Sequence, residues 1–380
     1  MGRPHTGPSN RRPKSKSKDE TMKYKTLALS ALALAASSAA IAQSSDTQVT
    51  LYGILDANVQ VLDGISNQTR VQSGGLSGSR FGIRGTEDLG GGLKAFFTLE
   101  SGINVDDGSY GQNAFWGRQA FVGLGTAYGK VSLGRQYGSV YTLTNEFSQF
   151  SNVGTGASTA VIGGFGGYEP VRGGNVSATG NGGPARVNNS IKLESLNYGG
   201  FSAGALWGMG EAAGDTNGTR VADIYGRYTA GGLDVMLSLV DDKADTLGQN
   251  VRTVSAAAAY DWNNFRFNGG VMQVNDRTAA DLDGKGYWVG ASYRAGQHVF
   301  KGQYVESKND GALADGKTQA FGVGYQYDLS KRTALYSSLT RFKNDGVGYV
   351  SRAAGTIPVG LTDANNRNLT EVVAGIRHSF

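Results

Sequence analysis

Cysteine is absent from the 380-residue chain, which excludes disulfide bonds, thiolate metal sites and cysteine nucleophiles together. Proline is scarce, with only 6 residues, so the chain is neither collagen-like nor a Pro-rich disordered segment. Glycine is abundant instead, with 59 residues against an ordinary share of about 7%. An ordered chain with many turns or close backbone contacts is therefore expected.

Histidine is also rare, and the three residues of this type, His5, His298 and His378, have no Ser or acidic partner at a recognisable spacing. We therefore expect no catalytic residues and no enzyme activity. The paired carboxylates Asp106-Asp107 and Asp241-Asp242 could touch a divalent ion, but we interpret them as solvated loop charge. Neither a metal site nor a cofactor is expected.

The N-terminus has the pattern of a secretory signal peptide. Residues 22–25 (MKYK) are a basic start, residues 27–36 are apolar, and Ala40-Ile41-Ala42 is a small-x-small cleavage site, so removal of residues 22–42 is expected. Residues 1–21 show no structural pattern and are interpreted as a misassigned upstream extension, with a real basic tail as the alternative. Residues 1–42 hold 8 of the 36 Lys and Arg residues and 2 of the 31 Asp and Glu residues, which leaves 28 cations and 29 anions. Overall basicity is thus no argument for a nucleic-acid partner.

Long apolar runs are missing after Ala42, because no window approaches the roughly 18 to 20 apolar residues that a membrane helix needs. No segment there shows a convincing helical period either. The dominant period is two, and it is clearest at Val49, Leu51, Leu55 and Val59, at Leu93, Ala95, Phe97 and Leu99, and at Phe321, Val323, Tyr325 and Tyr327. Such segments are strands with one apolar and one polar face. Aromatic residues near strand ends, Tyr287 and Trp288 among them, are expected at a membrane interface.

Turn lengths alternate regularly along residues 43–380. Short turns lie near residues 91, 128, 199, 231, 263, 296 and 330, and the last five are about 32 to 34 residues apart. Longer connections cover about 60–78, 103–113, 138–185, 210–219, 241–250, 275–284, 307–316 and 343–366. Eight long connections and seven short turns predict sixteen strands, whereas a soluble sandwich has no reason to segregate loop lengths in this way.

We therefore predict an all-β fold, a 16-stranded antiparallel up-and-down transmembrane β-barrel over residues 43–380 with both termini at the periplasmic, short-turn rim. Hydrocarbon offers no partner to backbone N–H and C=O groups, so the last strand must pair with the first. The lumen of so large a barrel is too wide for side chains to fill and holds water.

Motifs spread over residues 48–380 resemble Gram-negative general porins of the betaproteobacterial branch. They are 49–53 (VTLYG), 78–82 (GSRFG), 85–90 (GTEDLG), 118–124 (RQAFVGL), 133–136 (LGRQ), 186–190 (RVNNS), 329–333 (LSKRT) and 375–380 (GIRHSF). The resemblance implies an outer-membrane channel for passive diffusion of small hydrophilic solutes and ions. It also implies a homotrimer surrounded by outer-membrane lipid and lipopolysaccharide, with a third loop that folds into each barrel.

Residues 138–185 are far longer than the other connections, as a functional constriction loop would be, although a flexible external loop is the alternative. The acidic Pro-Glu-Phe-Gly-Gly tip usual in the family is missing, and residues 147–150 (FSQF) and 163–167 (GGFGG) stand there instead. Within this loop the only acids are Glu146 and Glu169, and the only base is Arg172.

Four arginines are candidate pore-lining residues: Arg80, Arg84, Arg118 and Arg186. Each is out of phase with apolar residues of its segment, as Arg118 is with Phe121, and a charge facing lipid at mid-depth costs about 2 to 4 kcal/mol, so all four should point into the lumen. By resemblance Arg80, Arg118 and Arg186 match the basic cluster opposite the narrowing loop. Arg135 shares the phase of its apolar neighbours and is discounted.

An arginine cluster facing few loop carboxylates predicts a transverse field and a weak preference for anions. Two alternatives stay open. The arginines could instead pair with nearby acids such as Glu87 or Glu100 and stabilise the wall, or the lumen could hold a binding site that makes the channel substrate-specific.

Overall fold

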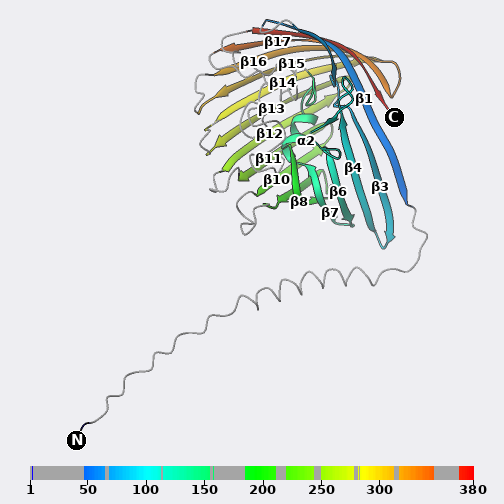
Figure 1. The fold of residues 1–380 in the computed structure, drawn as a ribbon, viewed down its shortest axis with the longest axis vertical. Helices are drawn as coiled ribbons and strands as arrows, with labels where there is room; N and C mark the ends of the chain where they lie inside the picture. Colours follow the sequence, from blue (N-terminus) through cyan, green and yellow to red (C-terminus); the bar gives the residue numbers. More distant parts are fainter. Residues whose placement is uncertain are drawn as a thin grey trace.

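The computed structural model describes residues 2, 47–64, 68–112, 114–154, 157, 185–210, 220–243, 250–277, 281, 283–311, 316–345 and 368–380. The interpretations of residues 1–21 and 22–42, and the candidate Glu169, lie outside these residues, apart from Gly2. Within the described part of the chain the strands belong to one antiparallel sheet that closes on itself, with α2 enclosed by it (Figure 1).

Sixteen strands of the described residues form the wall of the barrel, as predicted. They are β1 (Gln48–Asp63), β3 (Arg80–Gly90), β4 (Leu93–Ile103), β6 (Gln119–Gly125), β7 (Gly129–Tyr137), β8 (Arg186–Ser195), β9 (Phe201–Gly208), β10 (Val221–Ala230), β11 (Leu233–Lys243), β12 (Asn250–Trp262), β13 (Phe265–Asp276), β14 (Gly284–Ala295), β15 (His298–Asn309), β16 (Lys317–Asp328), β17 (Thr333–Asp345) and β18 (Asn368–Ser379). Two short strands, β2 (Gln68–Ser73) and β5 (Tyr110–Gly111), add to the sheet from the first and second long connections.

The barrel closes where β1 meets β18, as the backbone requires in a membrane. The pairing runs from Ile54 opposite Ser379 to Asp63 opposite Thr370. On its other side β1 pairs first with β3, up to Ile54 opposite Arg80, and then with β2, which returns along the same edge. On this side, β1 therefore has a partner along most of its length.

The seven short turns and eight long connections fall where the sequence predicts them. Between β10 and β11 the turn is Gly231-Gly232, with φ of +57° and +87°, a left-handed conformation that glycine adopts without steric cost. All short turns lie at one end of the strands because consecutive strands are antiparallel, and the long connections lie at the other end.

The two faces of the wall differ as the period of two predicts. Outward side chains are mostly apolar and exposed, for example Leu51 at 59% and Phe321 at 58% exposure. Inward side chains at the same depth are mostly polar, such as Asn58 and Gln303, and many are buried because another segment of the chain packs on them. Apolar residues on the outside and polar residues inside are the pattern of a membrane barrel.

The covering segment includes α2 (Ser139–Glu146), a helix that the sequence analysis did not predict. The lack of a convincing helical period in the sequence therefore did not exclude a short helix. Eight residues make only about two turns, too few to show a clear period. Val140, Leu143 and Phe147 are buried against inward residues of the wall, Met236 and Ala257 among them, so a small apolar core lies inside the barrel.

Candidate functional site

The start of α2 is fixed to the barrel wall by one carboxylate. Asp223 of β10 accepts hydrogen bonds from the backbone N–H of Ser139, at 2.7 Å, and from its hydroxyl, which also meets Ser238 of β11. Because the N–H groups at a helix start lack intrahelical partners, an acceptor with negative charge is favourable there. The first part of the predicted constriction loop thus lies inside the barrel, against β10 and β11.

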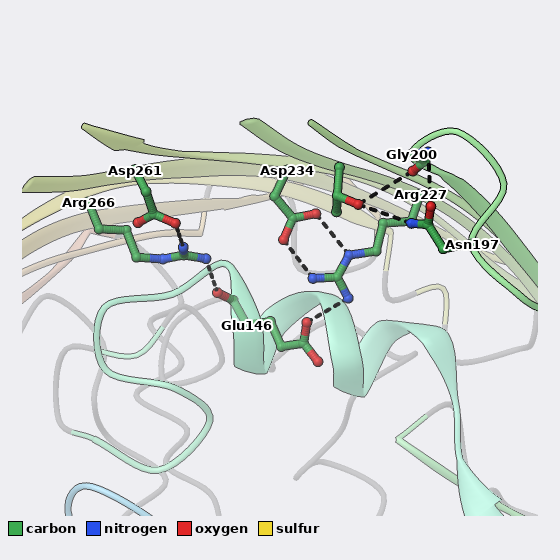
Figure 2. Close-up of polar contacts among 8 residues, drawn as sticks. Glu146, Asn197, Gly200, Arg227, Asp234, Asp261 and Arg266 are labelled. Carbon is green, nitrogen blue, oxygen red and sulfur yellow. Dashed lines mark hydrogen bonds and ion pairs between the residues drawn. The ribbon is translucent and has the colours of Figure 1, made fainter. Parts of the chain in front are cut away.

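The other end of α2 is held by an arginine of the wall, as Figure 2 shows. Arg227 reaches Glu146 at 2.7 Å and forms a two-pronged pair with Asp234 at 2.6 and 2.8 Å. Arg266 donates to the main-chain oxygen of Glu146 at 3.3 Å and to Asp261 at 2.7 Å. Glu146 is therefore paired with an arginine on the wall formed by β10 to β13.

Residues 147–150, which follow the helix, continue along the same wall. The main-chain oxygen of Phe147 accepts from the indole of Trp288 and the amide of Asn268, both at 2.6 Å, and the N–H of Gln149 donates to Gln303 at 2.8 Å. The expectation that Trp288 lies at the membrane interface is wrong, because its neighbour Tyr287 takes the outward face. An indole N–H inside the barrel needs an acceptor, and the loop supplies it.

The centre of the candidate site is the ion pair between Arg118 and Glu100. Arg118 Nε lies 2.7 Å from Glu100 Oε1, and both side chains are about 95% buried, at 5% and 4% exposure. Glu100 also accepts from the hydroxyls of Tyr137, at 2.8 Å, and Tyr52, at 2.9 Å. Because a buried charge is stable only when it is paired and hydrogen-bonded, Glu100 is held ionised by three donors.

Two stacked tyrosines stand between the arginines of the wall. The rings of Tyr137 and Tyr141 are parallel, 4.0 Å apart between centroids. The guanidinium of Arg186 lies 5.1 and 5.2 Å from these two centroids, and that of Arg118 lies 5.8 Å from Tyr137 and donates to the hydroxyl of Tyr141 at 3.2 Å. Cations over aromatic rings are attracted by the ring faces. Since Tyr141 belongs to α2, the helix is tied to the arginines as well.

The pKa of the Tyr141 hydroxyl is changed by the charges of nearby arginines. Burial, the largest effect, raises the pKa of Tyr141, but Arg118, Arg186 and Arg80 together outweigh burial, so the net pKa is lowered. Three guanidinium groups therefore act on one hydroxyl of the loop. Arg80 completes this set from β3, where its side chain is half-buried and donates to the main-chain oxygen of Gly78 at 2.9 Å.

The structure thus brings Arg80, Arg118 and Arg186 together and places Arg84 nearby on β3, exposed, with its guanidinium 5.0 Å from the ring of Tyr52. We call Arg80, Arg118 and Arg186 the arginine cluster. The alternative that the arginines pair with nearby acids applies to Arg118, which is paired with Glu100. Glu146 stands apart on the wall of β10 to β13.

Arg118 points inward as predicted, but the argument from its position relative to Phe121 is wrong. Phe121 points inward, where its ring packs against Phe96 at 6.2 Å, and Val122 is the outward residue, at 56% exposure. Arg118 precedes β6, so the period of that strand does not govern it, and its side chain turns inward to meet Glu100.

Among the inward cations that sequence reasoning missed are Arg227, Arg266 and Lys301. All three alternate with outward apolar residues, such as Phe300 beside Lys301, so the phase rule applied to every strand would have found them. Arg135 lies beyond an irregularity of β7 and donates to the main-chain oxygen of Gly117 at 2.8 Å. Its guanidinium also donates to the side-chain oxygen of Asn188 on β8, and its charge acts on that of Arg186.

The site therefore has two sides of different charge. Three guanidinium groups of the arginine cluster face a single carboxylate, Glu100. On the other side, Arg227 and Arg266 are in contact with three carboxylates, those of Glu146, Asp234 and Asp261. Net positive charge in one part of the lumen and net negative charge in another create a field, which aligns dipolar solutes and discriminates between ions.

Among the described residues, no three His, Asp or Glu side chains gather where they could hold a metal ion. Asp107 instead accepts from Ser109 at 2.7 Å, and Asp241 is paired with Arg252 at 3.2 Å. No helix in the described ranges is long and apolar enough to cross a membrane.

The known proteins to which this chain is similar are porins. The sequence model of the Gram-negative porin family matches residues 28–347. The chain is 35% identical over 358 residues to outer membrane porin protein 32 of Delftia acidovorans, covering 90% of this chain and 96% of the relative. It is 30% identical over 412 residues to an outer membrane porin protein of Bordetella pertussis, covering 89% and 96%.

Two solved structures have a similar fold. One is an anion-selective porin from Comamonas acidovorans, with a TM-score of 0.74 and 31% identity, covering 88% of this chain and 100% of that one. The other is the trimer form of in-vitro folded OmpT from Vibrio cholerae, with a TM-score of 0.63 and 18% identity, covering 88% and 99%.

Proposed function

Because the chain belongs to the family of Gram-negative porins, we propose that its barrel lets small hydrophilic solutes and ions diffuse passively across the outer membrane, with a weak preference for anions. The observation that carries the preference is the arginine cluster, three guanidinium groups around Tyr141 with one carboxylate among them. The name of the similar Comamonas protein, an anion-selective porin, supports the same sign.

Each candidate residue has a distinct role in this proposal. Arg80 and Arg84 keep exposed or half-exposed charge and act on passing ions directly. Arg118 is shielded by Glu100 and mainly fixes the stacked tyrosines, and Arg186 adds charge behind them. Glu146 contributes to the opposite, acidic side through its contact with Arg227.

Planar-bilayer recording of the purified chain tests the proposal. Under a salt gradient the reversal potential should have the sign of anion preference, and its magnitude should fall as the salt concentration rises and screens the fixed charges. A reversal potential of the cationic sign contradicts the proposed selectivity. Absence of any channel current from correctly folded protein contradicts the channel itself.

We further propose that the chain assembles as a homotrimer in contact with outer-membrane lipid and lipopolysaccharide. Support comes from the fold shared with the trimer form of OmpT and from the exposed apolar side chains around the outer face. Closure of the current in three equal steps, together with a trimer mass in mild detergent, is the expected result. A monomer mass with single closing steps would contradict it.

We also infer that residues 22–42 act as a signal peptide, that residues 1–21 are not part of the natural product, and that the working chain begins at Gln43. The basic start, apolar stretch and small-x-small site in the sequence support this inference. Mass spectrometry of protein from outer membranes should find Gln43 as the first residue. A different first residue would move the boundary.

A further inference from the structure

A row of three lysines lies on the outer face of the barrel, where the function proposed above assigns no role. Lys285 of β14 is directly opposite Lys308 of β15, and Lys308 is directly opposite Lys317 of β16. We call these residues the outer lysine row. They stand at the ends of the strands that lead into the long connections, and their side chains are 61%, 54% and 37% exposed.

The phase of each strand places the row outside the barrel. Lys285 has the phase of Val289, which is 58% exposed, and Lys317 has the phase of Phe321, also 58% exposed. Trp288, of the opposite phase on β14, faces inward and binds the loop segment. The row therefore continues the outward apolar face of these strands at its border with the long-connection rim.

Like charges directly opposite each other in a sheet are destabilising, so three aligned ammonium groups need a compensating partner. The protein supplies part of it. Asp310 lies 3.2 Å from Lys285 and 3.9 Å from Lys308, and Glu306 lies 3.2 Å from Lys317. Two carboxylates against three ammonium groups leave a net positive charge.

The neighbouring strand β17 extends the positive surface. Lys343 and Arg341 have the outward phase of Leu339, and Lys343 is paired with Asp345 at 3.3 Å, whereas Arg341 donates to the hydroxyl of Thr370 at 2.9 Å. Counting these residues with the row, five cations meet three carboxylates. An exposed positive surface directly above an exposed apolar one matches a molecule with an anionic head and acyl chains.

We infer that the outer lysine row binds the phosphate groups of a phosphorylated lipid in the outer leaflet, while the apolar residues below it contact the acyl chains. The inference rests on the placement of the barrel in the outer membrane with its long connections on the extracellular side. It adds a specific lipid site to the channel and leaves the lumen and its ion preference unchanged. Tyr287 and Tyr304, outward next to the row, are amphipathic rings suited to the same depth.

Native mass spectrometry of the detergent-solubilised chain tests the site. The probes are a diphosphorylated, acylated disaccharide lipid and its dephosphorylated analogue with the same acyl chains. The wild type should retain the phosphorylated lipid, and a triple variant with Lys285→Gln, Lys308→Gln and Lys317→Gln should bind it about tenfold more weakly. Each lysine near an anionic headgroup is worth about fivefold, and the acids of the site offset part of this.

Two further variants separate charge from other effects. Replacing the three lysines by Arg should preserve binding, because the positive charge stays. Replacing Lys331 and Arg332, both exposed in the short turn between β16 and β17, by Gln removes positive charge at the opposite rim and should leave lipid binding unchanged. All variants should conduct ions as the wild type does, so a failure of this inference differs from a failure of the channel.

Four outcomes would overturn the inference. The lysine-to-glutamine variant could bind the phosphorylated lipid as tightly as the wild type, or the dephosphorylated lipid could bind equally well. Millimolar inorganic phosphate could displace the lipid completely, which would make the row a site for free anions. Finally, the variant could lose subunits without losing lipid, which would make the row a contact between copies of the chain.

Discussion

Replacing Arg80 by Gln should lower the ratio of anion to cation permeability about fourfold. Arg80 is the member of the arginine cluster suited to this test, since its side chain is half-buried and its Nε hydrogen bond goes to a neutral main-chain oxygen, that of Gly78. Removing its charge therefore leaves no buried carboxylate without a partner. Glutamine keeps an N–H donor of shorter reach.

The magnitude follows from Coulomb's law. A unit charge acts on an ion about 6 Å away with about 0.7 kcal/mol in water. Screening at about 0.1 M salt, where the Debye length is about 10 Å, reduces this to about 0.4 kcal/mol. Such an energy changes the local concentration of an anion about twofold and that of a cation about twofold in the opposite sense, which gives a fourfold change in the ratio.

The assay is the reversal potential of single channels in a planar bilayer under a salt gradient, with Arg332→Gln as the matched control. Arg332 lies exposed in the short turn between β16 and β17, so its replacement removes the same charge outside the lumen. The control should behave as the wild type. If Arg80→Gln and Arg332→Gln give the same reversal potential as the wild type, the arginine cluster does not set the ion preference.

Three other results are expected. Arg118→Gln should lower the free energy of unfolding of the barrel by about 3 to 5 kcal/mol, because it leaves the buried Glu100 unpaired. The double variant with Glu100→Gln should recover most of this loss. Denaturant midpoints in detergent measure both effects. The pKa of Tyr141 is lowered below the usual value of about 10, so the anion preference should decrease between about pH 6 and about pH 9 as this residue becomes an anion. The Tyr141→Phe variant should show no such decrease in its reversal potential. An equal decrease in the wild type and the variant would contradict the assignment. Trp288→Phe removes one of two donors to Phe147, worth about 1 kcal/mol, so hydrogen exchange in residues 147–150 should accelerate about fivefold, and unchanged exchange would show that the remaining donor suffices.

The sequence was sufficient to predict the strands, their faces and the order of turns, because each depends on neighbouring residues. Leu51, Leu99 and Val323 show the period of two within a few positions, and short turns such as Gly231-Gly232 are defined by their own backbone requirements. The closure of the barrel was predicted from the properties of the membrane and not from any residue, since an open sheet edge is unfavourable in hydrocarbon. These properties are local or general.

The inner site was predicted only in part, because its partners are distant in sequence. Nothing near Ser139 indicates that Asp223 will hold the helix, and nothing near Phe147 indicates the indole of Trp288. Arg118 shows the limit of phase arguments, since a residue just outside a strand follows its partner Glu100 and not the period. Contacts between the loop and the wall depend on the folded barrel.

The pairing of β1 with β18 means that folding of this chain is complete only when its first and last strands meet. Ile54 cannot meet Ser379 until almost the whole chain has been synthesised, and Gln60 waits equally long for Glu371, to which its amide donates. Contacts between such distant residues carry a large loop-closure entropy and form slowly. Until then both terminal strands expose unpaired backbone edges that could join another chain. The cell must therefore keep the new chain apart from its copies until the membrane receives it, and every deletion that removes β18 leaves β1 open as well.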